Sequence, residues 1–371
     1  MVKKILIISY YFSPSPTPRA IRWKSLADSF SDKGHKVTIL TAEPEDKKDQ
    51  DQNRYRIIRI KENLLGRLRS KYLRKKNQTL VVNSSRSSNL KIFNLFLRFI
   101  KFFYNLFLSN LQWPDFSWTW IFTAKRRALK LVKEDGEFDI LISVSHPFSS
   151  HVIANSLKRK YPSLTWILDN GDPFSPLEES QPNNFFLFRS LNKKIENSYL
   201  NRGSYFCVTT EETKEIYKNC FKEDINKIKV IGPLLSHEAF KAFGNNVQKH
   251  NEELIFSFVG TIYKNLRHPA VPIQIIDSLI KDKDINACFN FYGETNDVDI
   301  SVLSTEKLKL NFYGQVSRKE ALRVMNQSDF LVNIGNSTTY QLPSKTIEYL
   351  ASQKPIINFS STAKDSSSKL L

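Results

Sequence analysis

Residues 4–41 read KILIISYYFSPSPTPRAIRWKSLADSFSDKGHKVTILT, and this stretch predicts the fold. Its first residues, Lys4–Tyr10, form an apolar run that is typical of a buried strand. In Arg19–Lys33 apolar residues recur at helical spacing, and Gly34 follows as a glycine that ends a helix. Lys36–Thr41 then returns to apolar and β-branched residues. A strand, a helix and a second strand in this order predict a parallel α/β unit whose sheet is covered on both faces.

The same alternation continues in two series, which indicates two domains. The first series has further strands at Phe138–Ser143, Thr165–Leu168, Tyr205–Val208 and Lys227–Ile231. A polar stretch, Ser236–Glu253, interrupts the pattern and is expected to be a linker. The second series has strands at Leu254–Val259, Ala287–Tyr292, Leu310–Tyr313, Phe330–Ile334 and Pro355–Phe359, with helices that include Arg318–Asn326 and Ser344–Ala351. We therefore predict an α/β protein with two Rossmann-like domains, residues 1–235 and residues 252–371, each built on a parallel sheet.

The composition is that of a globular protein without an export signal. The chain has 371 residues, of which 41% are hydrophobic, and this is enough for two cores. The apolar run near the N-terminus is too short for a signal peptide, and no stretch of about 18 uncharged apolar residues occurs, so we expect no transmembrane helix. Three scattered cysteines, Cys207, Cys220 and Cys288, have no metal-binding spacing and indicate a reducing compartment. We therefore expect a cytoplasmic protein.

Positive charge is concentrated in one segment. The net charge of the chain is +18, and residues 54–101 contribute +13 of it, with fourteen Lys and Arg against one acid, Glu62. Residues 90–111 read LKIFNLFLRFIKFFYNLFLSNL, with phenylalanines at spacings of three and four. Two interpretations remain open for this helix: it packs on the sheet as core, or it lies in a bilayer interface. Because each Lys or Arg near an anionic leaflet contributes about 1 kcal/mol, we predict that the insertion, about residues 54–111, contacts an anionic membrane surface.

The most specific stretch is residues 342–357, LPSKTIEYLASQKPII. Lys345 and Glu348 are three residues apart, so they share one face near the start of a helix. The helix dipole and the free N–H groups of the first turn attract phosphate, and Lys345 adds a charge-assisted hydrogen bond. A carboxylate at residue 348 can accept hydrogen bonds from two ribose hydroxyls. The pattern therefore favours a nucleotide diphosphate site over the alternative, an ordinary surface pair on a helix.

Together with two other stretches, this motif resembles the GT-B glycosyltransferases, in particular the retaining group called family 4. Residues 34–38, GHKVT, match the G-H-x-V-T strand of that group, whereas Pro14–Pro18 replaces its glycines. Residues 169–174, DNGDPF, resemble the D-x-R-D-P-W pattern of membrane-associated members, with Gly171 at the position of the arginine. The family often has a glutamate at the position of Tyr340. The resemblance extends over nearly the whole chain outside the basic insertion.

The resemblance implies that the second domain binds a nucleotide diphosphate sugar at the carboxyl ends of its strands. The implied donor-site residues are Gly260, Thr261, Lys264, Arg267, Gly293, Glu294, Gly314, Pro343, Ser344, Lys345 and Glu348. Of these, Lys345 and Arg267 would stabilise the departing diphosphate without a metal ion. The first domain would bind the acceptor, with Asp172 and His146 as candidate catalytic residues. His151 is the other histidine of this stretch, and packing on a helix is its alternative role.

We therefore expect a retaining glycosyltransferase that uses a nucleotide diphosphate sugar as donor substrate, with no cofactor and no metal ion. Its acceptor would be lipid-linked or a glycan, at the inner face of the cell membrane, in surface polysaccharide synthesis. GT-B chains usually continue through further helices, so we expect the second domain to be truncated at Leu371. Two alternatives remain. One is a catalytically weak GT-B scaffold protein, which Tyr340 and the early end favour; the other is a nucleic-acid binder, although no nucleic-acid motif accompanies the basic segment and no such partner is expected.

Overall fold

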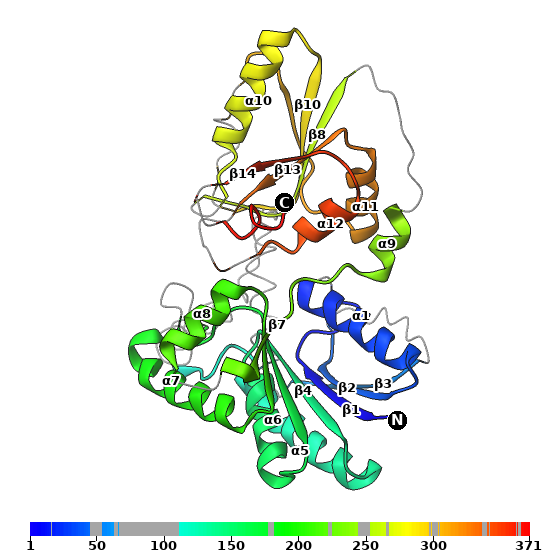
Figure 1. Ribbon diagram of the computed structural model, residues 1–371, viewed down its shortest axis with the longest axis vertical. Coiled ribbons are helices and arrows are strands. Elements are labelled where there is room, and N and C mark those ends of the chain that lie inside the picture. Colours follow the sequence, from blue (N-terminus) through cyan, green and yellow to red (C-terminus); the bar gives the residue numbers. More distant parts are fainter. Residues whose placement is uncertain are drawn as a thin grey trace, which may run out of the picture. The chain divides into compact units, whose positions relative to one another are not determined.

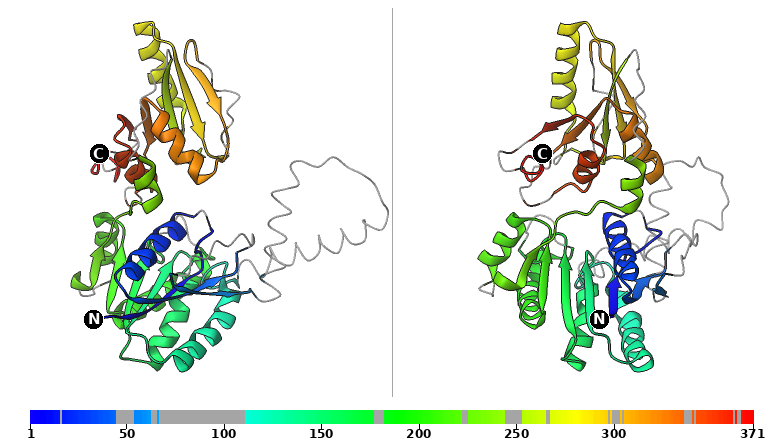
Figure 2. Two further views of the ribbon diagram at one scale, coloured as in Figure 1. Left: turned by 90° about the vertical axis from the view of Figure 1, so that its right-hand side faces the viewer. Right: turned by 45° about the vertical axis from the view of Figure 1, so that its right-hand side comes forward.

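The computed structural model describes residues 1–15, 17–44, 54–62, 66, 111–176, 182–221, 225–243, 253–264, 267–296, 298, 303, 305–335, 340, 342–360, 362 and 365–371. These residues form two compact units, each with its own parallel sheet (Figure 1, Figure 2). Unit 1 comprises Met1–Val208 and Lys214–Val230, and unit 2 comprises Thr209–Thr213 and Ile231–Leu371. The predicted class, an α/β protein with two parallel sheets, is confirmed. No helix in the described part of the chain is long and apolar enough to cross a membrane.

Sheet A, in unit 1, has seven parallel strands in the order β3-β2-β1-β4-β5-β6-β7. They are β1 (Lys4–Ser9), β2 (Lys36–Ala42), β3 (Arg56–Ile60), β4 (Ile140–Ser145), β5 (Thr165–Asn170), β6 (Tyr205–Val208) and β7 (Ile228–Val230). The chain builds outward from β1 in one direction and from β4 in the other, so the winding of the sheet reverses between β1 and β4. In open parallel sheets, ligands bind beyond the carboxyl ends of the strands at such a reversal.

Helices cover both faces of sheet A (Figure 1). They are α1 (Pro18–Asp32), α5 (Trp118–Asp135), α6 (Ser149–Lys160), α7 (Phe185–Arg202) and α8 (Glu211–Cys220). Trp23 and Ala27 of α1 pack on one face with alternate residues of β1, β2 and β4, such as Ile7. Trp120 and Ala128 of α5 pack on the opposite face, together with residues of α6 and α7. Side chains along a strand alternate between the faces, so these near-continuous apolar strands need cover on both.

Sheet B, in unit 2, has five parallel strands in the order β12-β10-β8-β13-β14. They are β8 (Leu254–Val259), β10 (Ala287–Tyr292), β12 (Lys309–Phe312), β13 (Phe330–Ile334) and β14 (Ile356–Phe359). A separate two-stranded sheet contains β9 (Ile262–Tyr263) and β11 (Thr295–Asn296). Helix α10 (Ala270–Lys283) covers one face of sheet B, and α9 (His237–Phe243), α11 (Arg318–Gln327) and α12 (Lys345–Ala351) cover the other (Figure 2). The winding of this sheet reverses between β8 and β13.

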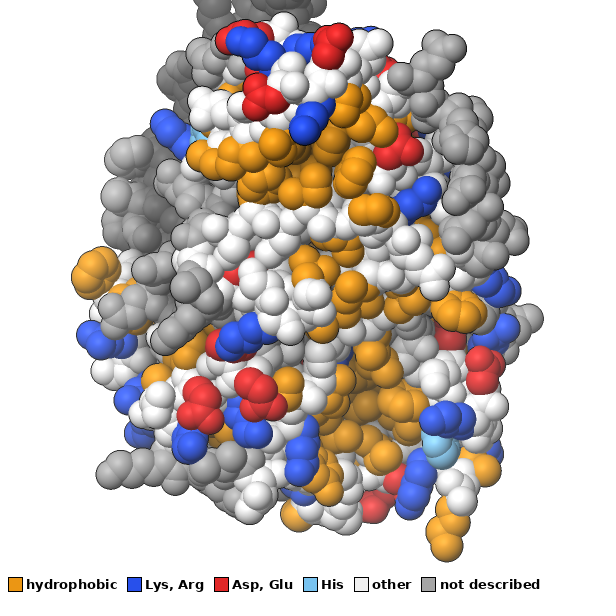
Figure 3. Space-filling model, turned by 45° about the horizontal axis from the view of Figure 1, so that its top comes forward, with side chains coloured by type: hydrophobic (Ala, Val, Ile, Leu, Met, Phe, Trp, Pro, Cys, Tyr) orange, Lys and Arg blue, Asp and Glu red, His pale blue; other side chains and the backbone are white. Residues whose placement is uncertain are grey.

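The face of sheet B that α10 covers is partly open toward β14. Ile357 and Phe359 of β14, and Phe330 of β13, belong to the apolar cluster on this face and are only partly buried. Figure 3 shows hydrophobic side chains gathered on the surface of unit 2, in the upper part of the view. Unit 2 therefore exposes part of its own apolar core.

The structure differs from the prediction at the start of the basic insertion. Residues 54–60 were assigned to the insertion, but Arg56–Ile60 form β3 and pair with β2 at the edge of sheet A. Arg56 binds the carboxylate of Asp135 (2.8 Å), and Arg59 donates to the carbonyl of Ser13 (3.1 Å). These charges therefore act within unit 1. The rest of the insertion, up to residue 110, falls outside the described part except for residues 61–62 and 66.

The predicted linker also differs. Its first residues form helix α9, whose Ala239 and Phe243 are buried with residues of α11 and α12. The polar surface of this stretch hid the apolar spacing of a short helix. Residues 236–243 therefore belong to the body of unit 2.

Candidate functional site

At the carboxyl edge of sheet B, backbone hydrogen bonds hold the loops in a row. The N–H of Gly260, after β8, donates to the carbonyl of Tyr292 (2.9 Å), and the N–H of Gly293, after β10, donates to the carbonyl of Gly314 (2.8 Å). Gly293 has a φ of +148°, and a Cβ there would lie 1.9 Å from the carbonyl oxygen of Gly260. Only glycine fits at this position. The two backbone hydrogen bonds join the turns at Gly260, Gly293 and Gly314 into one continuous edge.

Arg267 lies beside this row of turns. Its N–H donates to the carbonyl of Tyr263 (3.0 Å), so the chain folds back after β9. A Cβ on Gly260 would lie 3.7 Å from Nη1 of Arg267, which places the guanidinium against the turn. Burial lowers the pKa of Arg267, while Tyr263, Tyr349 and Asp365 oppose this effect. Because a guanidinium stays protonated in proteins, a partly buried cation lies at the end of β8.

Helix α12 is fixed to the same strand by Tyr349. The N–H of Val259, the last residue of β8, donates to the hydroxyl of Tyr349 (2.8 Å), and the tyrosine ring is buried. Burial raises the pKa of Tyr349, so the hydroxyl stays neutral. This contact holds α12 close to the reversal between β8 and β13, where a ligand is expected.

Three charged side chains meet at the start of α12. The carboxylate of Glu348 accepts a hydrogen bond from Nζ of Lys345 (2.7 Å) and pairs with Nη1 of Arg318 (2.8 Å), the first residue of α11. The side chain of Glu348 is 10% exposed, and that of Lys345 is 29% exposed. Arg318 also pairs with Glu238 (3.3 Å), so the charges within the cluster balance and Lys345 is its more exposed cation. Lys345 and Glu348 share a helix face as predicted, whereas Arg318 was missed because it comes from a different helix.

The other predicted donor-site residues differ in exposure. Lys264, Glu294, Gly314 and Ser344 are exposed, Thr261 is half-buried and Pro343 is buried. Glu294 contributes its backbone carbonyl to the edge, where it accepts from the N–H of Ile262 (2.8 Å). Contact with a nucleotide stays a prediction for all of these residues.

At the carboxyl edge of sheet A, two arginines of α1 pair with one carboxylate. Asp169 of β5 is 2% exposed. Its carboxylate accepts from Nε1 of Trp23 (2.8 Å) and from Nη1 of Arg19 (3.3 Å), and Nη2 of Arg22 lies 3.7 Å away. Helix α1 follows β1, and β4 lies between β1 and β5 in the sheet. These contacts therefore join α1 to the end of β5, across the point between β1 and β4 at which the winding of the sheet reverses.

Arg19 also fills the space beside Gly171. The guanidinium of Arg19 lies next to this glycine. A guanidinium is thus present beside the loop position at which the family pattern has its arginine, but α1 supplies it. Arg19 was not predicted, and the only signal for it was the unexpected glycine.

The two predicted acceptor-side residues, His146 and Asp172, are exposed at the same edge. His146 follows β4, and its ring centroid lies 5.6 Å from that of Phe116. Asp172 follows β5, directly after Gly171. Both side chains are solvent-exposed, and a catalytic role for them stays a prediction.

His151, by contrast, is buried and packs inside unit 1. Its Nδ1 accepts from the hydroxyl of Ser143 (2.7 Å), and its Nε2 donates to Oδ1 of Asn170 (2.6 Å). The amide nitrogen of Asn170 donates to Glu196 (3.3 Å), which fixes the amide orientation and assigns the histidine proton to Nε2. Burial lowers the pKa of His151 to about 4, although Asn170 and Asp169 oppose it. The neutral ring of His151 therefore has a structural role, which was the alternative given for it in the sequence analysis.

The same network positions the loop after β5. The buried carboxylate of Glu196, on α7, accepts from the hydroxyl of Tyr217 (2.6 Å) and from the N–H of Ser175 (2.9 Å). Tyr217 in turn accepts from the N–H of Phe174 (3.2 Å). Burial raises the pKa of Glu196, and these hydrogen bonds oppose the rise. The loop that presents Asp172 is thus fixed from α7 and α8.

Sequence comparison does not assign a family, since no family model and no curated protein matches the chain. Solved structures match its fold. A glycosyltransferase from Rickettsia africae aligns over 100% of this chain and 87% of its own, with 15% identity and a TM-score of 0.57. The catalytic domain of starch synthase IV from Arabidopsis thaliana, bound to ADP and acarbose, aligns over 96% and 83%, with 10% identity and a TM-score of 0.57. WaaG, a glycosyltransferase involved in lipopolysaccharide biosynthesis, aligns over 99% and 83%, with 10% identity and a TM-score of 0.54.

At these identities the likeness concerns the fold alone. The fold is that of the GT-B glycosyltransferases, with two parallel-sheet α/β domains. The predicted resemblance is confirmed at this level, and membership of family 4 stays a prediction.

Proposed function

We propose that the protein is a retaining glycosyltransferase of the family 4 type, which transfers a sugar from a nucleotide diphosphate sugar to a lipid-linked or membrane-proximal acceptor in surface glycan synthesis. The observation that carries this proposal is the cluster of Lys345, Glu348 and Arg318 at the start of α12, on the edge that Arg267 and the glycine turns also line. A fold by itself does not define an activity, so this cluster, rather than the fold, supports the proposal.

The cluster suits a nucleotide diphosphate without a metal ion. The ammonium of Lys345 has three N–H donors, so it can keep its bond to Glu348 and also donate to a phosphate. Arg267 would bring a second cation to the departing diphosphate, and the glycine row would let phosphate oxygens approach the backbone. Glu348, positioned by Arg318, would accept the two ribose hydroxyls. The ADP in the matched starch synthase structure is consistent with a nucleotide ligand on this fold.

On the acceptor side we assign His146 and Asp172 to the incoming hydroxyl, because both are exposed at the carboxyl edge of sheet A. No protein nucleophile is proposed. In a retaining transfer of this type, the incoming and leaving groups share one face of the sugar, and the departing diphosphate takes the proton of the acceptor. The part that WaaG plays in lipopolysaccharide biosynthesis supports a surface glycan as product.

Lys345→Ala tests the donor site. Thermal unfolding with a panel of nucleotide sugars should show stabilisation of the parent protein, about 2.7 kcal/mol at a hundredfold excess over Kd. Lys345→Ala should lose both this stabilisation and sugar transfer, because the charge that meets the diphosphate is gone. Lys319→Ala is the matched control, since Lys319 is exposed in the first turn of α11 beside Arg318. Transfer by Lys345→Ala at the parent rate would disprove the site, and a parent that binds no nucleotide sugar at micromolar concentration would instead indicate a scaffold protein.

We also propose a contact between α7 and an anionic membrane. At the start of this helix Phe186 is 97% exposed, Leu187 55% and Leu191 40%. The helix also exposes three cations, Arg189, Lys193 and Lys194. Its one acid, Glu196, is buried. Exposed apolar residues with cations and no exposed acid are typical of helices that lie in a bilayer interface.

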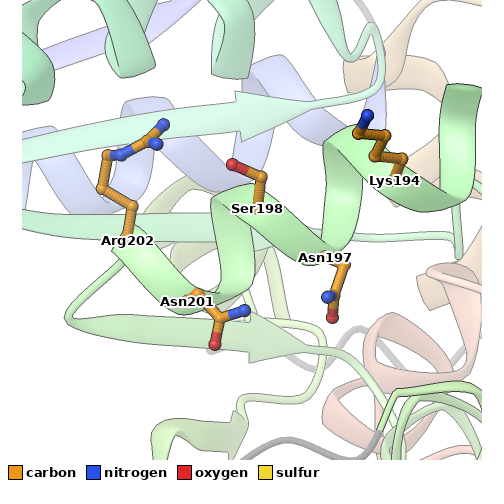
Figure 4. A pocket seen from close by; sticks show the side chains of 5 residues that line it. All are labelled: Lys194, Asn197, Ser198, Asn201 and Arg202. Carbon is orange, nitrogen blue, oxygen red and sulfur yellow. The ribbon is translucent and has the colours of Figure 1, made fainter.

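The second half of α7 carries polar and cationic side chains. Figure 4 shows the side chains that line an open pocket there, which are Lys194, Asn197, Ser198, Asn201 and Arg202. We expect sedimentation with vesicles that contain anionic lipid and not with zwitterionic vesicles. Reversing Lys193 and Lys194 to Glu should weaken this binding at least about tenfold, because each cation contributes about 1 kcal/mol. The same reversal of Lys281 and Lys283 on α10 is the control, and an equal loss in both variants would contradict a specific contact at α7.

A further inference from the structure

Two aromatic side chains gather with His146 at the carboxyl edge of sheet A. Tyr11 follows β1, His146 follows β4, and Phe116 lies in the loop before α5. The ring centroid of Phe116 is 6.3 Å from that of Tyr11 and 5.6 Å from that of His146. We call these three side chains the aromatic platform. It connects the ends of β1 and β4, the point at which the winding of the sheet reverses and sheets of this kind bind ligands.

The platform differs from the aromatic core of unit 1. Its rings are tilted, by 40° between Tyr11 and Phe116 and by 51° between Phe116 and His146. Tyr11 and Phe116 are half-buried, and His146 is exposed. In the core, by contrast, Phe148 and Phe174 stack with their centroids 3.7 Å apart and are 1% and 4% exposed. The platform therefore keeps part of its surface in contact with solvent.

A buried carboxylate ties the loop of Phe116 to the loop of His146. Asp115 is fully buried, and its two oxygens accept from the hydroxyl and the N–H of Ser149, both at 2.8 Å. Ser149 begins α6, three residues after His146. On the other side of Phe116, the N–H of Ser117 donates to the same carboxylate (2.9 Å). The two loops are thus held together before any ligand binds, which lowers the ordering cost of binding.

Tyr10 holds the platform against the core. Its ring meets those of Tyr11, Phe116 and Trp120 edge to face, with centroids 5.0, 5.4 and 5.3 Å away. Its hydroxyl donates to the carboxylate of Glu62 (2.5 Å). Trp120 is fully buried in the core of unit 1. Because edge-to-face pairs have a preferred geometry, these contacts fix the directions of the rings.

A pyranose ring has two properties that such a platform can recognise. The C–H groups on its faces carry a partial positive charge, and the face of an aromatic ring is negative, so the two attract each other when they stack. Its hydroxyls point outward and need polar partners. His146 is exposed within the platform, and Asp172 is exposed after the next strand, β5. An acyl chain has no hydroxyls and would leave these polar groups unused.

From these contacts we infer that the aromatic platform is a sugar subsite: a pyranose ring stacks on Phe116 and Tyr11, and His146 meets one of its hydroxyls. The group of the acceptor that enters the edge of sheet A is therefore a saccharide and not a lipid chain. The inference rests on the proposed function and adds the chemical class of the acceptor group.

Saturation-transfer NMR can test the subsite, with the methyl pyranosides of glucose, galactose and mannose as probes. We expect saturation of the ring C–H protons of at least one of them at millimolar concentration, stronger than that of 1-hexanol, the probe for an acyl chain. Phe116→Leu keeps an apolar side chain but removes the ring. It should weaken pyranoside binding about threefold to tenfold, the contribution of one aromatic contact. Phe116→Tyr keeps the ring and should bind as the parent does.

Phe122→Leu is the matched control. Phe122 is 59% exposed on α5, where its ring meets that of Trp118, so its loss should leave pyranoside binding unchanged. Tyr11→Leu is a second platform variant and should also weaken binding. Tryptophan fluorescence during urea unfolding shows whether each variant is folded, because all five tryptophans belong to unit 1.

Lys345→Ala separates this inference from the proposed function, because Lys345 belongs to unit 2. That variant should lose nucleotide binding and keep pyranoside binding. A parent that binds a pyranoside at the platform but no nucleotide sugar would remove the proposed function and leave the sugar subsite in place. Four results would overturn the subsite: no saturation of any pyranoside, equal affinity of Phe116→Leu and the parent, loss of pyranoside binding in Lys345→Ala, or stronger saturation of 1-hexanol. The last result would assign the platform to a lipid chain.

Discussion

Replacing Gly293 with alanine tests the geometry of the donor edge. Gly293 has a φ of +148°, and a Cβ would lie 1.9 Å from the carbonyl oxygen of Gly260 and 2.6 Å from its carbonyl carbon. Real Cβ atoms essentially never come closer than 3.0 Å to another heavy atom, so the turn at Gly260 would have to retreat by about 1.1 Å. The substitution therefore moves the backbone that is expected to meet the diphosphate.

The cost of this change has two parts. A non-glycine residue in this backbone region costs about 1–3 kcal/mol. Movement of the turn also weakens the bonds from Gly260 to Tyr292 (2.9 Å) and from Gly293 to Gly314 (2.8 Å), which contribute about 1 kcal/mol each. We expect Gly293→Ala to lower the free energy of unfolding of unit 2 by about 2–4 kcal/mol. Gly314→Ala is the matched control: Gly314 has a φ of +69°, and a Cβ at this position would have no atom within 4 Å, so the substitution should cost about 1 kcal/mol.

Urea unfolding can assign the loss to unit 2. All five tryptophans, residues 23, 113, 118, 120 and 166, belong to unit 1, so their fluorescence follows that unit. Circular dichroism follows both units. Gly293→Ala should shift the circular dichroism transition to lower urea, leave the fluorescence transition in place and lose nucleotide binding in calorimetry. The reasoning is refuted if Gly293→Ala and Gly314→Ala unfold at the same urea concentration, or if Gly293→Ala binds nucleotide as the parent does.

Three further substitutions have defined outcomes. His151 is neutral in the folded protein, with its pKa lowered to about 4, so its contribution to stability is present above pH 6.5 and is lost as the pH falls toward 4. His151→Gln should remove up to about 3 kcal/mol of this pH dependence, measured by urea unfolding with tryptophan fluorescence; an unchanged slope would contradict it. Asp115 is fully buried and accepts four hydrogen bonds at the starts of α5 and α6, so Asp115→Ala should destabilise unit 1 by about 2–4 kcal/mol in the same assay, and a loss below 1 kcal/mol would be inconsistent with this role. Arg318→Met should weaken nucleotide binding about tenfold in calorimetry by releasing Glu348, and unchanged affinity would show that Lys345 alone positions this carboxylate.

The features that local spacing encodes were predictable from the sequence. The apolar runs predicted the order of strands and helices, and the strand predicted at Phe138–Ser143 is β4, shifted by two residues. The three-residue spacing of Lys345 and Glu348 predicted their shared face, because the helix itself brings such residues together. The glycines at residues 260, 293 and 314 were placed at strand ends by the same local pattern.

Contacts between elements were not predictable, because they depend on which strands become neighbours. Arg19 meets Asp169 only because β4 inserts between β1 and β5, and Arg318 meets Glu348 only because α11 and α12 pack on the same face of sheet B. The count of positive charges in residues 54–101 also included Arg56, which does not belong to the insertion. That residue pairs with Asp135 beside an edge strand, where charged side chains are common, so part of the basic excess is used inside unit 1.

Each sheet edge has a buried carboxylate that pairs with two cations, and in unit 2 one of these cations, Arg318, also pairs with Glu238. Glu348 pairs with Lys345 and Arg318, and Asp169 pairs with Arg19 and Arg22. Without the carboxylate the cations would repel each other and stay mobile, so an anionic ligand would have to order them when it binds. With a carboxylate for each cation the pairs carry no net charge, as for Lys345 and Arg318 with Glu348 and Glu238 in unit 2. At the edge of sheet A two cations on one carboxylate are ordered and positive, whereas in unit 2 Glu238 balances Arg318 and Arg267 brings a further cation to the edge.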